Sequence, residues 1–223
     1  SESHFAGTTG YGYDDTGREK LETAFAQVFS AESALLRWQI SSGTAAIALA
    51  LFGILRPGDT MLSVTGRPYD TLIGVIGIDG QGGKGSLADF GIGYRQVDFD
   101  SNGDPDHGAI AKALDTSVKL VFIQKSRGYA DRRTLMNYEI GEIVNTVRNS
   151  GSNAYVVVDN CYGEFVETRE PCEYGADLCC GSLIKNPGGG IATSGGYVAG
   201  RADLVDMAAS RLNAPGVGAH IGP

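Results

Sequence analysis

Hydrophobic residues recur along the chain at two spacings, and each spacing predicts a different kind of element. Leu21 and Phe25 recur at helical spacing, which predicts a helix that is capped by Thr16 or Gly17 and ends near Phe29. Similar patterns predict further helices. These are expected at residues 45–55, 70–78, 106–114, 139–149 and 202–212.

Short apolar runs between these helices predict strands. The run of residues 155–158 is apolar at every position, as in strands whose two faces are both buried in a parallel sheet. Strands are expected at residues 34–40, 60–64, 94–99, 120–124, 154–159 and 196–200. Because strands and helices alternate, the fold class is expected to be α/β, with a mainly parallel sheet flanked by helices.

The same pattern predicts how the chain is divided. Residues 1–16 are polar and rich in glycine, so they are expected to form an N-terminal arm rather than part of a core. Residues 17–223 are expected to form one large domain. Nothing after residue 212 predicts a second domain.

Composition and charge narrow the class of protein. Hydrophobic residues make up 42% of the chain, enough for a core. The net charge is -8 and there is no basic block, which argues against nucleic acid as the main partner. The chain has no membrane-length apolar run and no signal peptide, which favours the cytoplasm. The four cysteines form no C-x-x-C pair and lie far from the histidines, so no metal site is expected.

The main candidate for chemistry is Lys185, which stands between an apolar run and a glycine-rich loop, three residues after Ser182. A lysine is costly to bury. In such a turn it could bind a phosphate as a point charge, or form a Schiff base with a carbonyl cofactor. The alternative is an ordinary surface lysine before a loop, so the choice depends on the rest of the chain.

Other polar groups follow predicted strands, where ligands bind in open α/β sheets. The stretch Ser42-Gly43-Thr44 precedes a helix, whose free N–H groups and dipole suit an anion, although an ordinary helix cap has the same sequence. Asp159 ends a buried strand, where a carboxylate can bind a metal, orient a base, pair with a cationic ring nitrogen or cap a turn. Tyr69 follows a turn and could stack on a flat ligand or simply pack.

Together these groups suit pyridoxal 5'-phosphate. That cofactor requires a lysine, an acid against its ring nitrogen and an anion site for its phosphate, and it gains from a stacking ring. All four features occur along the chain, in the order phosphate loop, ring, acid, lysine.

The sequence resembles the fold-type I pyridoxal-phosphate enzymes of transsulfuration, the cystathionine lyase and methionine gamma-lyase group. Within that group it is most similar to the aluminium-resistance branch of the methionine gamma-lyase family. The resemblance extends over nearly the whole chain, and its most specific part is Ser182-x-x-Lys185 at its distance from Asp159. The other matching stretches are Tyr11–Arg18, Leu21-Glu22, Phe25-Ala26, Ser42–Thr44, Tyr69, Phe122–Tyr129 and Asp159-Asn160.

The resemblance implies a role for each matching residue. Lys185 would form the Schiff base, Asp159 would pair with the pyridinium nitrogen, and Tyr69 would stack on the ring. The phosphate would be held by Ser42, Gly43, Thr44 and Ser182.

The resemblance also implies an assembly. In the transsulfuration enzymes a tyrosine and an arginine of the N-terminal arm reach the phosphate in the neighbouring subunit. Tyr13 and Arg18 are the nearest matches here, with Tyr11 as a rival to Tyr13. A homodimer or homotetramer with shared sites is therefore expected.

Three departures from the family pattern affect specificity. Ile184 stands where the transsulfuration enzymes have a threonine, so one phosphate contact is lost or moved. Residues 124–127 form a different loop from the one in those enzymes. The C-terminal small domain, which carries the arginine for the substrate carboxylate, is absent from this chain, so a fragment of a longer enzyme is one expectation.

The function that follows is a pyridoxal-phosphate-dependent carbon–sulfur lyase, acting on a sulfur-containing amino acid by beta or gamma elimination. Lys185 would take the alpha proton as general base, Asp159 would keep the ring protonated, and Tyr69 would complete the catalytic set. The alternative is a pyridoxal-phosphate-binding domain without activity. A P-loop nucleotide binder does not fit, because the glycine-rich loop 81–86 lacks the required spacing.

Overall fold

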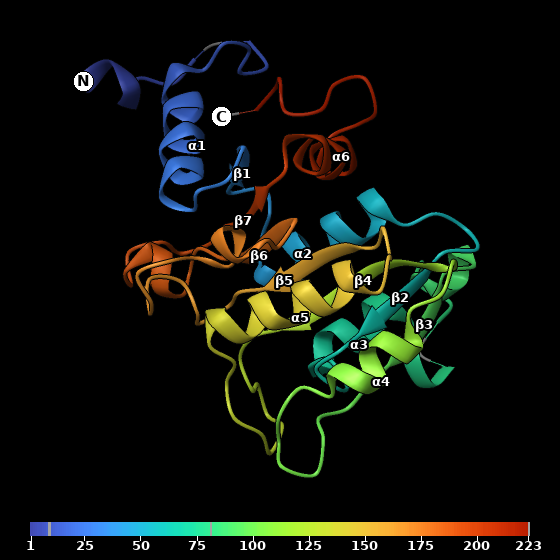
Figure 1. The fold of residues 1–223 in the computed structure, drawn as a ribbon. Coiled ribbons are helices and arrows are strands. Elements are labelled where there is room, and N and C mark those ends of the chain that lie inside the picture. The colour runs from blue at the N-terminus through green and yellow to red at the C-terminus, as the bar shows by residue number, and fades with distance from the viewer. Residues whose placement is uncertain (9, 81, 223) are drawn as a thin grey trace.

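The computed structural model describes residues 1–8, 10–80 and 82–222, and its centre is one seven-stranded sheet (Figure 1). The strand order is β1-β7-β6-β5-β4-β2-β3. The strands are β1 (Ser33–Arg37), β2 (Thr60–Ser63), β3 (Gly93–Gln96), β4 (Val118–Gln124), β5 (Tyr155–Asp159), β6 (Leu178–Ser182) and β7 (Gly196–Gly200). Strands β3, β2, β4, β5 and β6 are parallel to one another, whereas β7 is antiparallel to both β6 and β1. The predicted α/β class with a mainly parallel sheet is confirmed.

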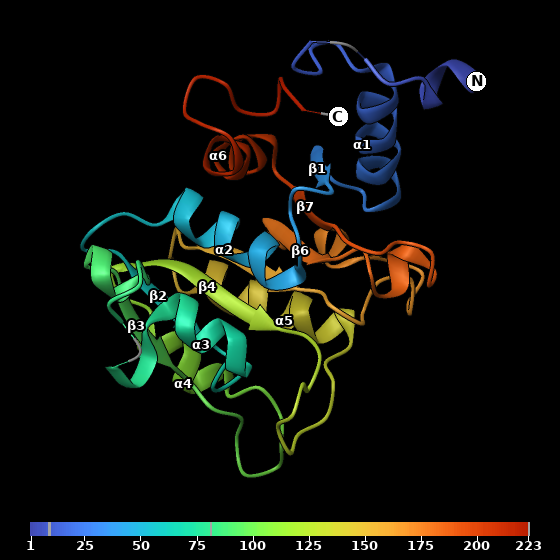
Figure 2. The same cartoon turned by 180° about the vertical axis from the view of Figure 1, so that it is seen from behind.

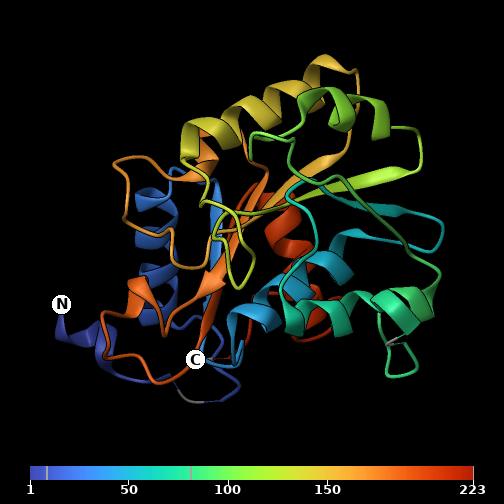
Figure 3. The same ribbon diagram turned by 90° about the horizontal axis from the view of Figure 1, so that it is seen from below.

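Helices cover both faces of the sheet. They are α1 (Thr16–Val28), α2 (Gly43–Ile54), α3 (Asp70–Ile76), α4 (His107–Ala113), α5 (Asn137–Asn149) and α6 (Ala202–Leu212). Helices α2, α3 and α6 share one hydrophobic core with the sheet, and α1, α4 and α5 share a second core on the opposite face. Figures 2 and 3 show these layers from behind and from below. The central strands of the sheet are therefore shielded from water on both faces.

The predicted helix starts differ from the observed ones where a side chain caps the helix. Helix α1 is capped by Asp15 rather than by Thr16 or Gly17, because the Asp15 carboxylate accepts the Arg18 N–H at 2.8 Å. Helix α2 begins at Gly43, two residues before the predicted start, because the Ser42 hydroxyl accepts the Ala45 N–H at 3.1 Å.

Other bounds differ for local reasons. Helix α3 ends at Ile76 instead of residue 78, because Gly77 adopts a left-handed conformation with φ 86°. Strand β6 was not among the predicted strands, since its sequence of cysteines, glycine and serine has no strong β pattern. The predicted loop 81–86 includes Gln81, which lies outside the described residues. No helix in the described part of the chain is long and apolar enough to cross a membrane.

The two ends of the described chain lie on the same side of the molecule, beside α1 (Figure 1). The Gly222 N–H donates to the Tyr11 carbonyl at 2.7 Å, and the Arg18 guanidinium donates to the Gly12 and Gly222 carbonyls at 2.6 and 2.5 Å. One backbone hydrogen bond and the Arg18 side chain thus tie the arm to the other end of the described chain.

Candidate active site

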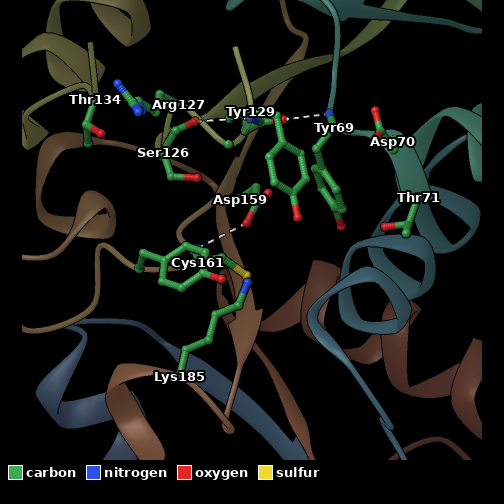
Figure 4. A pocket seen from close by; sticks show the side chains of 13 residues that line it. Tyr69, Asp70, Thr71, Ser126, Arg127, Tyr129, Thr134, Asp159, Cys161 and Lys185 are labelled. Atoms are coloured by element: carbon green, nitrogen blue, oxygen red, sulfur yellow. Dashed lines mark hydrogen bonds between the residues drawn. The ribbon is translucent and has the colours of Figure 1, made fainter. Parts of the chain in front are cut away.

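A cavity of about 680 Å³ lies at the carboxyl ends of β4 and β5 (Figure 4). Its walls come from the start of α3, from the loop after β4, and from the turns that follow β5 and β6. The side chains that matter for the chemistry are those of Tyr69, Asp159, Cys161, Tyr162 and Lys185. Parallel strands bring their carboxyl ends to one edge of a sheet, so this is where the topology favours a ligand.

Asp159 is the last residue of β5 and is 2% exposed. Its Oδ1 accepts the Cys161 N–H at 3.1 Å. Burial raises the pKa of Asp159, while the Cys161 hydrogen bond and the positive charges of Lys185 and Arg132 oppose that rise. Burying an ionised carboxylate costs free energy because the charge loses its hydration, and a cationic partner in the cavity would stabilise it.

Lys185 follows β6 and directly precedes a short turn of 3-10 helix (Asn186–Gly188). It is half-buried, lines the cavity, and its side chain points towards Cys161 and Asp159 (Figure 4). Desolvation lowers the pKa of Lys185, but the groups of Cys161, Tyr162 and Asp159 outweigh it, so the net shift is upward. The structure therefore brings into one cavity the predicted acid, which ends β5, and the predicted lysine, which follows β6.

The predicted anion site lies beside these two residues. A methyl group added at Gly43, the first residue of α2, would stand 2.9 Å from the Cys161 Sγ and 3.3 Å from the Ser182 Cβ. The N-terminus of α2 and Ser182 thus lie close together. Ser182 is 1% exposed and its Oγ has no hydrogen-bond partner within the described chain. A buried hydroxyl without a partner is rare and suits a ligand that accepts hydrogen bonds.

Tyr69 immediately precedes α3, and both its side chain and its backbone form hydrogen bonds that fix its position. Its hydroxyl lies 2.9 Å from the Thr44 Oγ1, and its N–H donates to the Gln124 Oε1 at 2.9 Å. Burial and the nearby Asp159 carboxylate raise the pKa of Tyr69 to about 12, so the phenol is neutral at ordinary pH. Its ring lines the cavity, where stacking on a flat ligand was predicted.

The two arm residues lie apart from this cavity. Tyr13 is 54% exposed, whereas Arg18 is 8% exposed and is bonded to backbone carbonyls of its own chain. Neither lines the cavity described above. Their role in a partner subunit's site stays a prediction.

Three further residues belong to the site and were not predicted. Cys161 and Tyr162 come two and three residues after Asp159, so the rule that ligands bind after parallel strands would have pointed to them. Burial and the Asp159 carboxylate raise the pKa of the Cys161 thiol, which keeps it neutral. Thr71 on α3 bonds the Thr44 hydroxyl at 2.9 Å, and no sequence signal marks it.

These residues fit the geometry that pyridoxal phosphate requires. An acid and an amine face one cavity, an aromatic ring forms one wall, and a helix N-terminus with an unpartnered buried hydroxyl lies beside them. A zinc or calcium site would need a cluster of ligating side chains. No group of three or more His, Cys, Asp or Glu residues suited to a metal occurs among the described residues.

Comparisons with known proteins agree with this geometry. The family model for methionine gamma-lyase matches residues 1–223. Protein YnbB of Bacillus subtilis is 51% identical over 222 residues, a match that covers 100% of this chain and 53% of YnbB. The chain therefore spans about half the length of this curated relative.

Solved structures extend the comparison. A carbon–sulfur lyase involved in aluminium resistance from Clostridium novyi is 51% identical, with a TM-score of 0.95; the match covers 100% of this chain and 53% of that chain. The pyridoxal-5'-phosphate-dependent protein YhfS from Escherichia coli is 22% identical, with a TM-score of 0.68 over 94% of this chain and 50% of that chain. The second likeness shows the fold alone, that of the fold-type I pyridoxal-phosphate enzymes. By its match along the whole chain, this protein belongs to the methionine gamma-lyase family.

Proposed function

We infer that this chain forms the cofactor-binding part of a pyridoxal-phosphate-dependent carbon–sulfur lyase that acts on a sulfur-containing amino acid by beta or gamma elimination. The observation that carries this inference is the convergence of Asp159 and Lys185, from different strands, on one cavity beside the α2 N-terminus. Family membership and the name of the Clostridium novyi relative support the reaction class.

Each residue would hold a different part of the cofactor. Lys185 would bind its carbonyl carbon, and Asp159 would pair with its ring nitrogen. Tyr69 would stack against the ring. The phosphate would be held by Ser42, Gly43, Thr44 and Ser182. When bound, pyridoxal phosphate supplies an electron-withdrawing ring that stabilises negative charge on the alpha carbon of an amino acid.

The chain's own side chains would then move and hold protons. Lys185 would be the base that takes the alpha proton at Nζ, because it is the lysine that lines the cavity. The Asp159 carboxylate would favour a protonated ring nitrogen, since an anionic carboxylate favours a cationic neighbour. The burial of Asp159 and the Tyr69 ring would keep water away from this pair, which would strengthen it.

The test is a panel of cysteine, cystathionine and methionine, with ammonia, keto acid and thiol measured for each. Beta elimination from cystathionine releases pyruvate and homocysteine, whereas gamma elimination releases 2-oxobutyrate and cysteine. The identity of the keto acid therefore decides the reaction. We expect one of these keto acids in equal amount to ammonia, and none from Lys185→Ala.

Two results would change the proposal. If the protein binds the cofactor but releases no ammonia from any member of the panel, the alternative of a binding domain without activity is favoured. If Lys185→Ala releases product at the rate of the unmodified protein, Lys185 is not the base.

A further inference from the structure

Tyr162, on the turn after Asp159, has a strained backbone. Its φ is 68°, in the left-handed region that a bulky residue adopts only at an energetic cost. Such outliers persist where the surrounding structure enforces them, and they often occur at functional sites. Tyr162 lines the cavity, and its side chain is not needed for the core because the residue is 61% exposed.

The turn that carries Tyr162 is fixed from beneath. The Gly163 N–H donates to the Asn160 carbonyl at 2.8 Å, which closes the turn. A methyl group at Gly163 would stand 2.7 Å from the Lys125 Cδ, so the turn rests directly on that buried lysine. The Lys125 ammonium is in turn held by Asn137 at 2.7 Å and by Glu167 at 3.0 Å. These contacts hold the turn in place and so explain why Tyr162 keeps its strained backbone conformation.

The result of this strain is a contact with Lys185. The Lys185 Nζ lies 4.1 Å from the centre of the Tyr162 ring, within the range of a cation–π interaction. Because a ring face attracts an ammonium but not a neutral amine, the contact favours the protonated lysine. The other titratable or charged groups around Lys185 or in its cavity are Asp159, Cys161, Glu164, Tyr69, Asp70, Arg127 and Tyr129.

We propose that Tyr162 is a positioning residue whose ring face holds the Lys185 Nζ inside the cavity and stabilises the ammonium that forms when this amine has taken a proton. The proposal rests on the proposed function for the use of Lys185 in catalysis. Beyond that function, it assigns Tyr162 the role of stabilising Lys185 after the lysine has taken the proton. The ring face acts on the protonated amine, whereas the Asp159 carboxylate remains available to a ring nitrogen.

The experiment measures the reactivity of Lys185 without any cofactor. Formaldehyde and cyanoborohydride methylate only the neutral amine, and peptide mass spectrometry follows each lysine separately over a range of pH. We expect Tyr162→Leu to shift the Lys185 profile to lower pH. On the acidic limb its methylation should be about three- to tenfold faster, the range given by a cation–π contact. The plateau at high pH should not change.

Two variants act as controls. Tyr162→Phe keeps the ring face and should react within about twofold of the unmodified protein at every pH. Tyr129→Leu removes another exposed ring of the same cavity and should leave the Lys185 profile unchanged. The remaining lysines report on the folding of each variant, because the buried Lys125 stays unreactive only in a folded chain.

The outcome separates this proposal from the proposed function. If Tyr162→Leu scales the rate equally at all pH, the ring only restricts access and the proposal is wrong. An unchanged profile overturns it as well. Because the assay contains no pyridoxal phosphate, failure of the protein to bind that cofactor would contradict the proposed function without deciding the role of Tyr162.

Discussion

Two lysines near the same edge of the sheet differ in every respect that matters for chemistry. Lys125 is 2% exposed, and its ammonium is held by Asn137 and forms an ion pair with Glu167 at 3.0 Å. Lys185 is half-buried, lines the cavity, and faces a thiol and an aromatic ring. Among the described residues, no carboxylate lies within salt-bridge distance of the Lys185 amine.

The difference shows how the fold separates structure from reactivity. A buried lysine whose ammonium is held by an amide oxygen and a carboxylate is fixed in place, and it supports the loop above it. A lysine that lines a cavity and has no carboxylate within salt-bridge distance leaves its amine accessible, so that it can form a new bond with a ligand. The first predictions below test the reactive side of this comparison, and the later ones test the structural side.

The largest expected effect is on turnover, from Asp159→Asn. The change keeps the shape of the side chain but removes the charge that favours a protonated ring nitrogen. We expect turnover on the best substrate of the panel to fall by about 10²–10³, and cofactor binding to weaken only modestly. Measuring cofactor binding by an absorbance titration separates a loss of turnover from a loss of binding. Near-normal turnover with the cofactor bound would assign Asp159 a structural role.

Substitution of the supporting lysine should instead affect stability. Lys125→Met leaves Glu167 without its cation, so we expect the free energy of unfolding to fall by about 3 kcal/mol. Urea unfolding measures this loss, and Lys112→Met on the exposed face of α4 is the matched control, expected within about 0.5 kcal/mol of the unmodified protein. If Lys125→Met is as stable as the control, Lys125 does not support the turn.

The double variant Lys125→Met with Glu167→Gln sharpens that result. It removes both charges, so part of the lost stability should return, because the uncompensated carboxylate is gone. No recovery would indicate that the packing of the lysine stem on Gly163, rather than its charge, holds the turn.

A smaller effect should come from Glu164, which is 1% exposed and accepts the Tyr197 hydroxyl at 2.9 Å. Burial raises the pKa of Glu164 from 4.5 to about 7, so the folded chain binds this proton more tightly than the unfolded chain. This contribution to stability is complete below about pH 4.5 and is lost as the pH rises through about 7.

Comparison with Glu164→Gln isolates this proton. Between about pH 5 and pH 8, the unmodified protein should lose about 2 kcal/mol more stability than Glu164→Gln. Glu142→Gln, at an exposed position on α5, should follow the unmodified protein. Parallel stability curves for all three proteins would show that Glu164 ionises in the folded chain as easily as in the unfolded one.

Much of this structure could be predicted from the sequence, and the exceptions have physical causes. The hydrophobic periodicity of residues 202–212 predicted α6 with the bounds that are observed. The apolar run before Asp159 predicted that this residue ends a strand, as it does in β5. Local patterns cannot show which side chains fold over a distant residue. Tyr162 reaches Lys185 only because a turn rests on Lys125, a contact between three separate segments. For the same reason, the different surroundings of Lys125 and Lys185 were not visible in the sequence.

The most direct test of the central claim is to reduce the protein with borohydride after adding one equivalent of pyridoxal phosphate, and to map the label by peptide mass spectrometry. We predict a yellow protein before reduction and a pyridoxyl group on Lys185 afterwards, with none on Lys125. A label on Lys125, or a protein that stays colourless and unlabelled when the cofactor is added, would contradict the assignment of Lys185 as the reactive lysine.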